Sequence, residues 1–258
     1  MKIAVCLKLT PVTTADIRVA ADGRSLLLAD VETALSFYDE HALEAALRLR
    51  DALAGTTIHA LSVGGDECVK CLQHAAALGA ASVLHIAAPG VDARAAARLA
   101  AAALRDLAPD LAFCGRQAID DDLRLFPGAL GELLGWPHLS AATSLEVAAT
   151  LSSATARRRC EGGEEALQAA LPAVVSWDRT PFEPRIPTLK AKLAARRRQP
   201  DVRTPDSLGV SADELAAALA VTNYAPPPQR APGRIITGPP EEAAAELARL
   251  LRGEAGVI

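Results

Sequence analysis

Three consecutive carboxylates, Asp120 to Asp122, are the residues whose type and spacing point most directly to chemistry. Left uncompensated they repel phosphate, so a nucleotide beside them needs its phosphates on backbone N–H groups and its ribose hydroxyls near the acids. A hard cation is a second interpretation, but consecutive aspartates point in different directions and such sites collect oxygens from several segments. Helix capping or loop solvation is the third. We therefore predict no metal site, and the other two interpretations stay open.

The stretch that carries these aspartates has the pattern of a buried strand, a loop and a helix. Leu111 to Cys114 is an apolar run ended by Gly115, and a second apolar run begins near Phe126. In α/β folds, ligands lie beyond the carboxyl ends of the parallel strands, where the unpaired N–H groups of the next helix favour phosphate. The pattern therefore predicts either a nucleotide site or a solvent-filled loop.

Other reactive side chains do not form a catalytic group in the sequence. Cys68 and Cys71 form a CxxC, but no second CxxC or metal-spaced histidine pair accompanies it. The five cysteines are an odd number and several lie in apolar runs, so packing is their expected role. The five histidines are scattered through helix and strand patterns without a convincing nucleophile and base pair. Lys8, after the first apolar run, is either an exposed lysine or the partner of an anion.

Composition places the chain among ordinary globular proteins. It has 258 residues, 50% of them hydrophobic, with 27 Lys and Arg against 31 Asp and Glu, for a formal charge of −4. This charge argues against nucleic-acid binding, and an aromatic content of 3% argues against base-stacking surfaces. No window approaches the ~18 apolar residues of a membrane span. We expect a soluble, cytoplasmic protein with reduced thiols and no membrane insertion.

Hydrophobic periodicity predicts strands that alternate with helices over the first half of the chain. A hairpin-like excursion at residues 10–30 follows the first strand. Asp39 is a natural N-cap for the first helix, whose acids come early and whose arginines come late. The strands are expected at residues 3–7, 58–63, 83–87 and 111–114, and the helices at 39–53, 66–78 and 91–107. This βαβαβαβ order predicts an α/β fold with a doubly wound, mostly parallel sheet.

The pattern changes after Pro137. β-rich runs at residues 140–147, 154–160 and 166–170 indicate antiparallel additions to the sheet, and residues 172–177 have the pattern of one more buried strand. The α/β core is therefore expected to extend from residue 1 to residue 178.

From Arg179 the chain loses periodicity and has the proline-rich composition of an extended arm, which we assign to residues 179–258. C-terminal helices are expected at residues 211–219 and 241–251. The basic run from Lys190 to Arg198 is either a solvated face or a docking site for an acidic protein surface.

Six sequence blocks, in order, resemble those of the electron transfer flavoprotein β subunit. They are IAVCLK near the start, YDEHALEAALRLRD at Tyr38 to Asp51, GRQAIDDD at Gly115 to Asp122, LLGWP at Leu133 to Pro137, LPAVVSWD at Leu171 to Asp178 and EPRIPTLKAK at Glu183 to Lys192. The resemblance implies an adenine nucleotide α-hydrolase-like fold and a subunit that pairs with a larger, FAD-carrying α subunit. The pair takes electrons from a flavin-dependent dehydrogenase, such as an acyl-CoA dehydrogenase, and passes them to a quinone reductase or similar acceptor. In typical members the β subunit holds an AMP, and in electron-bifurcating relatives the same site holds a second FAD.

The resemblance also implies which residues contact the nucleotide and which contact partner proteins. The family's nucleotide positions correspond here to Cys6, Ser36, Phe37, Tyr38, Asp39, Val63, Gly115, Arg116, Gln117, Ala118, Ile119, Asp120, Asp121, Asp122, Leu123, Arg124, Leu125 and Phe126. The segment that recognises dehydrogenases corresponds to Pro184 to Lys192, with Leu189 as its anchoring leucine and Lys190 and Lys192 beside it. An apolar anchor among cations suits transient docking, because the charges speed encounter and the leucine fills a pocket. No catalytic residue is implied, since bound flavin carries the electrons.

The sequence departs from the family pattern at both nucleotide-holding segments. After the aspartates the family usually has Gln-Thr-Gly or Gln-Val-Gly, whereas this chain continues from Leu123 to Gly128 without them, and Pro127 has no N–H to donate. Ser36-Phe37 replaces the usual Asn-Pro, and Arg124 is a candidate compensating charge. We expect AMP or FAD in this subunit to be weaker than usual, altered or absent. Two rival hypotheses are a stand-alone adenine-nucleotide-binding enzyme or sensor and a degenerate scaffold subunit without its own nucleotide.

Overall fold

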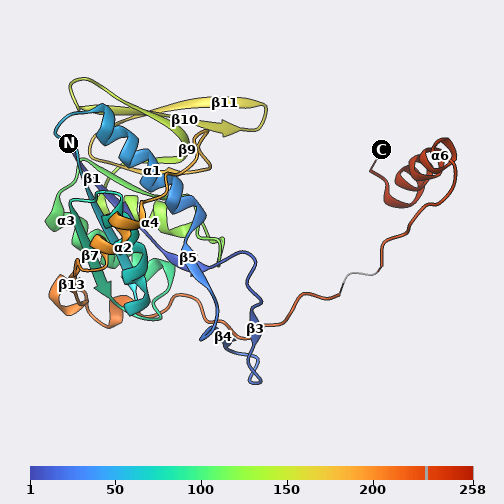
Figure 1. Ribbon diagram of the computed structural model, residues 1–258, viewed down its shortest axis with the longest axis horizontal. Helices are drawn as coiled ribbons and strands as arrows, with labels where there is room; N and C mark the ends of the chain where they lie inside the picture. The colour runs from blue at the N-terminus through green and yellow to red at the C-terminus, as the bar shows by residue number, and fades with distance from the viewer. Residues whose placement is uncertain (230–231, 258) are drawn as a thin grey trace.

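The computed structural model describes residues 1–229 and 232–257, and its centre is a nine-stranded sheet (Figure 1). The strand order across the sheet is β11-β10-β9-β12-β8-β1-β6-β7-β13. The strands that run parallel are β1 (Lys2–Cys6), β6 (Thr57–Gly64), β7 (Ser82–Ala87), β8 (Leu111–Gly115), β9 (His138–Val147), β12 (Ala173–Trp177) and β13 (Asp201–Arg203). From β1 the chain proceeds to β6 and β7 on one side and then to β8 on the other. The predicted doubly wound, mostly parallel sheet is confirmed.

Helices cover both faces of the sheet, as a doubly wound fold requires (Figure 1). α1 (Phe37–Ala52) and α2 (Val69–Ala77) pack on one face. α3 (Ala93–Leu107) and α4 (Leu125–Leu134) pack on the other. A 3-10 turn at Asp66–Cys68 leads into α2, so the predicted helix at residues 66–78 is present with a tighter first turn.

Each central strand divides its side chains between two buried cores. In β1, Ile3 and Val5 lie in the core under α1, whereas Ala4 and Cys6 lie in the core under α3. Because both faces are buried, a central strand is apolar throughout, which explains the continuous apolar runs of the sequence. Phe113 of β8 is among the largest fully buried side chains and makes an edge-to-face contact with Trp177, with ring centroids 5.2 Å apart.

Two antiparallel strands extend one edge of the sheet. β10 (Ser153–Cys160) pairs antiparallel with β9 and with β11 (Gly163–Ala170). β9 runs parallel to its other neighbour, β12, although the β10–β11 hairpin lies between them in the chain. The hairpin predicted at residues 10–30 is also present. Its paired strands are β3 (Arg18–Val19) with β4 (Leu26–Leu27), and β2 (Leu9–Pro11) pairs with β5 (Thr33–Leu35).

The arm predicted to be extended from residue 179 folds back on the core over part of its length. α5 (Leu189–Ala195) packs on α2, and β13 adds a parallel strand beside β7. Thr188 accounts for the start of α5, since its Oγ1 accepts the N–H of Ala191 at 3.3 Å. β13 supplies hydrogen-bond partners to the backbone of β7, which without it is a free edge. The prediction of an extended segment is therefore wrong for these residues.

The helix predicted at residues 211–219 is also wrong, because only a 3-10 turn forms there, at Asp213–Leu215. Arg94 of α3 donates to the carbonyl of Ala216 at 2.8 Å, so this carbonyl bonds to α3 in place of a further helical turn. α6 (Pro240–Leu250) agrees with the second predicted C-terminal helix, and Figure 1 shows it apart from the sheet. No helix in the described ranges is long and apolar enough to cross a membrane.

Phe113→Ala is expected to lower the free energy of unfolding by about 3–5 kcal/mol, because it removes a fully buried ring and leaves a cavity beside Trp177. Val202→Ala in β13 is the control, since that side chain is exposed. Urea unfolding followed by circular dichroism measures both variants. A loss below about 1 kcal/mol for Phe113→Ala would contradict the two-sided core described above.

Candidate functional site

A cavity of about 530 Å³ lies beyond the carboxyl ends of the central strands. Residues from the ends of β1, β6 and β8 line it, together with the first residues of α3 and α4. β6 and β8 pair with β1 from opposite sides, so the cavity lies where the strand order reverses. Doubly wound proteins bind their ligands at such a point. The cavity is therefore the candidate ligand site of this fold.

The Asp39 carboxylate joins the ends of two strands to the first turn of α1. Its Oδ2 accepts the backbone N–H of Lys8 at 2.8 Å, and its Oδ1 accepts that of Gly115 at 2.7 Å. A Cβ on Gly115 would lie 2.6 Å from the Cβ of Tyr38, so only glycine allows this approach. Burial raises the pKa of Asp39 to about 7, although the two N–H donors act to lower it.

The prediction that Asp39 is the N-cap is wrong, because α1 begins at Phe37.

The three aspartates are bound by side chains of the chain itself. Lys8 Nζ donates to Asp120 at 2.7 Å and to Asp121 at 3.0 Å, and Gln117 Nε2 donates to Asp122 at 2.5 Å. Burial lowers the pKa of Lys8, but the two aspartates outweigh burial and raise it above its ordinary value. Within the part of the chain that the structure describes, no three His, Cys, Asp or Glu side chains are grouped to hold a metal ion. Lys8 is thus the internal counter-charge of the aspartates.

The start of α4 offers few groups that could hold a phosphate. Pro127 lies in its first turn and has no N–H, and Leu125 and Phe126 present apolar side chains to the cavity. Arg124 also lines the cavity, but its Nε donates to Gln117 Oε1 at 2.7 Å. The N-terminus of this helix is therefore flanked by apolar side chains and by the Arg124 guanidinium, which bonds a neutral amide.

Acidic side chains outnumber basic ones around the cavity. Among the described lining residues, the acids are Asp39, Asp92, Asp120 and Asp121 and the bases are Lys8 and Arg124. Lys8 is paired with two of these acids, whereas Arg124 donates through Nε to the neutral amide oxygen of Gln117 and keeps its charge, so a phosphate placed here meets more acids than bases. The acids of this wall therefore disfavour the phosphate of the AMP that the family resemblance implies, and Arg124 is the candidate counter-charge.

Most residues predicted to contact a nucleotide line this cavity, and the others lie outside its wall. Those in the wall are Cys6, Asp39, Val63, Gly115, Gln117, Ala118, Asp120, Asp121, Leu123, Arg124, Leu125 and Phe126. Those outside it are Ser36, Phe37, Tyr38, Arg116, Ile119 and Asp122. Arg116 lies over the Tyr38 ring at 4.9 Å and pairs with Asp178 at 2.9 Å. Nucleotide binding by any of these residues stays a prediction.

Sequence reasoning missed two segments of the cavity wall. One is the start of α3 with Asp92, and the other is a C-terminal segment that includes Leu219 and Tyr224. Asp92 connects them, because its Oδ1 accepts the N–H of Ala95 and its Oδ2 that of Ala218, both at 2.8 Å. An aspartate before an Ala-rich helix is an N-cap signal that could have indicated the first segment. The second comes from 126 residues further along the chain and has no local signal.

The cysteines of the cavity are packing residues in this structure. Cys6 and Cys114 line it, and burial raises the pKa of both thiols. Burial also raises the pKa of Cys71, in the CxxC, to about 12. Thiols held in the protonated form are poor nucleophiles and metal ligands. Four of the five cysteines are buried and all five are free thiols, in agreement with the predicted packing role.

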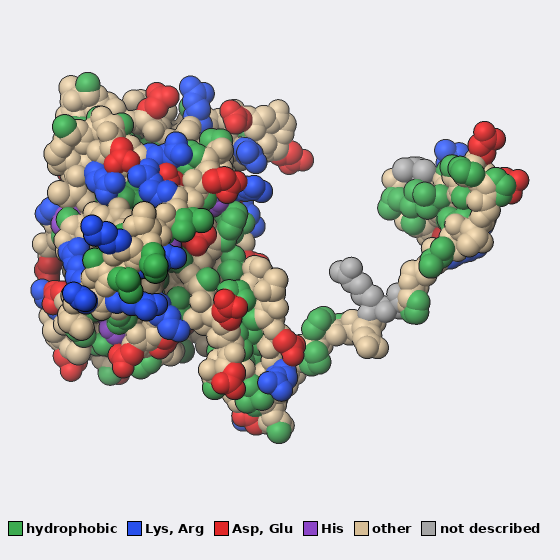
Figure 2. All heavy atoms as spheres, in the orientation of Figure 1, with side chains coloured by type: hydrophobic (Ala, Val, Ile, Leu, Met, Phe, Trp, Pro, Cys, Tyr) green, Lys and Arg blue, Asp and Glu red, His purple; other side chains and the backbone are tan. Residues whose placement is uncertain are grey.

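Leu189, the predicted docking anchor, points to solvent on the arm. Its side chain is 73% exposed, and that of Ile186 before it is 84% exposed. Lys190 and Lys192 are exposed on the same short helix. Figure 2 shows Lys and Arg side chains gathered on the face of the molecule that carries α2, on which α5 packs. The structure brings an apolar anchor and cations together, and docking by them stays a prediction.

Comparison with known proteins identifies the family. A family model described as Electron transfer flavoprotein domain matches residues 25–208. The chain is 33% identical, over 263 aligned positions that cover both chains completely, to the mitochondrial electron transfer flavoprotein subunit beta of Oryza sativa subsp. indica. The chain belongs to the family of electron transfer flavoprotein β subunits. The predicted resemblance to that family is confirmed.

The similarity extends across distant organisms. The electron transfer flavoprotein subunit beta of Bradyrhizobium diazoefficiens is 30% identical over 259 positions, again with both chains covered completely. That of Mus musculus is 32% identical over 222 positions, which cover 84% of this chain and 85% of the mouse protein. Family membership therefore applies to the core and the arm together.

Asp39→Asn is expected to remove a pH dependence of folding stability. The pKa of Asp39 is raised to about 7 in the folded chain and lies near about 4 in unfolded chains. Its contribution to stability is therefore fully present below about pH 4 and is lost as the pH rises through about 7. Chemical denaturation between about pH 5 and about pH 8 should show the wild type losing stability relative to the variant. Parallel curves for the two proteins would mean that Asp39 does not titrate in this range.

Proposed function

We propose that this chain is one subunit of a heterodimeric electron transfer flavoprotein and pairs with a larger, FAD-carrying α subunit. The complex takes electrons from a flavin-dependent dehydrogenase, such as an acyl-CoA dehydrogenase, and delivers them to a quinone reductase or similar acceptor. The observation that carries the proposal is the full-length similarity to proteins named as electron transfer flavoprotein β subunits.

In this function the chain positions the α subunit and provides a surface for partner proteins. Flavin, when bound mainly by the α subunit, supplies the electron-transfer chemistry. α6 supports the pairing, because it is a short amphipathic helix that lies apart from the sheet with Leu247 exposed (Figure 1). A helix of this length has little stability in water without a surface to pack on. A companion subunit is the surface that we infer for it.

The arm supplies the contact with the dehydrogenase. Leu189 is an exposed apolar side chain beside two exposed cations, Lys190 and Lys192. Charges at the rim of an interface accelerate encounter, and a buried apolar anchor slows dissociation. This combination suits a carrier that must bind its donor quickly and leave it again.

A second candidate function is a scaffold subunit without its own nucleotide. The observation that favours it is the cavity wall, in which acids outnumber bases, Lys8 is already paired with two of them and Pro127 has no N–H to donate. In that case the cavity keeps its shape through the bonds of Asp39 and Lys8 rather than through a ligand.

Co-expression with a flavin-binding α subunit tests the proposal. We expect a yellow one-to-one complex that contains about one flavin and less than one AMP, because acids outnumber bases in the cavity wall. Extraction, absorbance and nucleotide chromatography measure both contents. Two flavins for each heterodimer would contradict the expectation that nucleotide binding in the cavity is weak or absent. A colourless monomer that hydrolyses nucleotide would contradict the carrier function.

Leu189→Ala is expected to lower kcat/KM of the dehydrogenase for the carrier about tenfold, because it removes the apolar anchor of the docking surface. Association of the two subunits, measured by gel filtration, should not change. Leu151→Ala, an exposed leucine in the turn between β9 and β10, is the control. An unchanged kcat/KM for Leu189→Ala would remove the docking role.

A further inference from the structure

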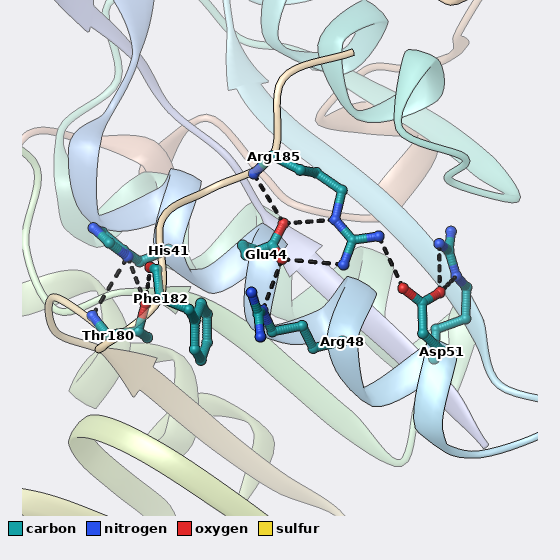
Figure 3. Close-up of polar contacts among 8 residues, drawn as sticks. His41, Glu44, Arg48, Asp51, Thr180, Phe182 and Arg185 are labelled. Carbon is teal, nitrogen blue, oxygen red and sulfur yellow. Dashed lines mark hydrogen bonds and ion pairs between the residues drawn. The ribbon is translucent and has the colours of Figure 1, made fainter. Parts of the chain in front are cut away.

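The arm is attached to α1 through a buried carboxylate, Glu44 (Figure 3). Arg185 of the arm donates from Nε to Glu44 Oε2 at 2.8 Å and from Nη2 to Oε1 at 3.0 Å. Its backbone N–H donates to the same carboxylate at 3.1 Å, and its Nη1 donates to Asp51 at 2.8 Å. Arg48 Nε also donates to Glu44, at 2.9 Å. We name Glu44, Arg48, Asp51 and Arg185 the arm anchor cluster.

The geometry of the cluster restricts the direction of the arm. The Glu44 side chain is 2% exposed, and although burial raises its pKa, the hydrogen bonds from Arg185 and Arg48 outweigh burial and lower it. Glu44 is therefore held as a buried anion. A planar guanidinium that bonds a carboxylate through two nitrogens is fixed in angle as well as in distance.

Two further contacts hold the preceding part of the arm on the same helix. Thr180 Oγ1 lies 2.7 Å from His41 Nδ1, and the Arg48 guanidinium lies 4.1 Å from the centre of the Phe182 ring (Figure 3). His41, Glu44 and Arg48 are spaced by three and four positions, so they share one face of α1. The arm thus follows that face from Thr180 onward.

The predicted docking residues come directly after this attachment. Leu189 is four positions beyond Arg185 and begins α5, which has seven residues. So short a helix is not stable by itself, and its position depends on the attachments before and after it. After it, Arg198 donates to the carbonyl of Ala80 at 2.8 Å. The arm anchor cluster is the attachment that precedes Leu189 in the chain.

We propose that Glu44 and Arg185 are positioning residues that hold the Leu189 side chain in the direction from which it enters a partner dehydrogenase. This inference rests on the docking function proposed above. α1 keeps its place on the sheet without the cluster, because Leu43 and Leu47 are buried in the core. Loss of the ion pair therefore loosens the segment that precedes Leu189 and leaves the core and the cavity in place.

The first test uses the purified two-subunit complex with an acyl-CoA dehydrogenase as electron donor. Arg185→Met is expected to lower kcat/KM of the dehydrogenase for the carrier about tenfold, through a higher KM and an unchanged kcat. Arg179→Met removes the same charge from an exposed position of the same arm and should leave kcat/KM unchanged. Equal losses in both variants would assign the effect to overall charge and would overturn the inference.

Arg185→Lys separates charge from geometry. Lysine keeps the positive charge but cannot form the two parallel bonds to Glu44, so a several-fold loss in kcat/KM is expected. Full activity of Arg185→Lys would overturn the positioning role. Should Arg185→Met fail to fold, the double substitution Glu44→Met with Arg185→Met replaces the buried pair by apolar side chains, and the same tenfold loss is expected of it.

A double-mutant cycle with Leu189→Ala decides whether Arg185 acts through the anchor. If it does, Arg185→Met adds little further loss of kcat/KM to the Leu189→Ala variant. Losses that multiply independently would overturn the inference and leave the docking function intact. No loss in Leu189→Ala alone would instead remove the docking function itself. Gel filtration and thermal unfolding of each variant verify that the complex is assembled and folded.

Discussion

The hydrogen bonds of the Asp39 carboxylate are the interaction on which the rest of the structure depends. The backbone N–H groups of Lys8 and Gly115, at the ends of β1 and β8, each donate to one of its two oxygens. Without the carboxylate these donors would lie beyond the sheet with no strand to receive them, at a cost comparable to a lost hydrogen bond each. The strand ends, the aspartate loop and the start of α1 therefore keep a common geometry around the cavity.

α1 carries this geometry from the cavity to the arm. Asp39 in its first turn contacts the strand ends, and Glu44 further along contacts Arg185 of the arm. The positively charged side chains also differ between the cavity and the arm. The cations at the cavity, Lys8 and Arg124, are bonded to groups of the loop that contains the aspartates, whereas Lys190 and Lys192 of the arm are exposed. The chain thus has a cavity at the strand ends and presents exposed positive charge on the arm.

The sequence by itself determined the architecture. Strand and helix periodicity depends on neighbours along the chain, so the apolar runs and the helix patterns indicated a doubly wound sheet. The order of those elements then placed the candidate site at the strand ends, near Cys6 and Gly115, because right-handed crossovers leave few topologies. The six blocks indicated the family, and the absence of an N–H at Pro127 predicted a change in phosphate binding, which stays a prediction.

Only the tertiary structure decided which distant segments meet. Glu44 and Arg185 are 141 positions apart, and Asp92 and Ala218 are 126 apart, so neither pair has a local signal. The same reason explains why α5 and β13 were predicted as extended chain, since their attachment to α2 and β7 stabilises them. Asp39 shows the limit most clearly. Its residue type suggests a helix cap, but its role follows from two N–H groups that folding brings to it, and sequence periodicity carries no information on such distances.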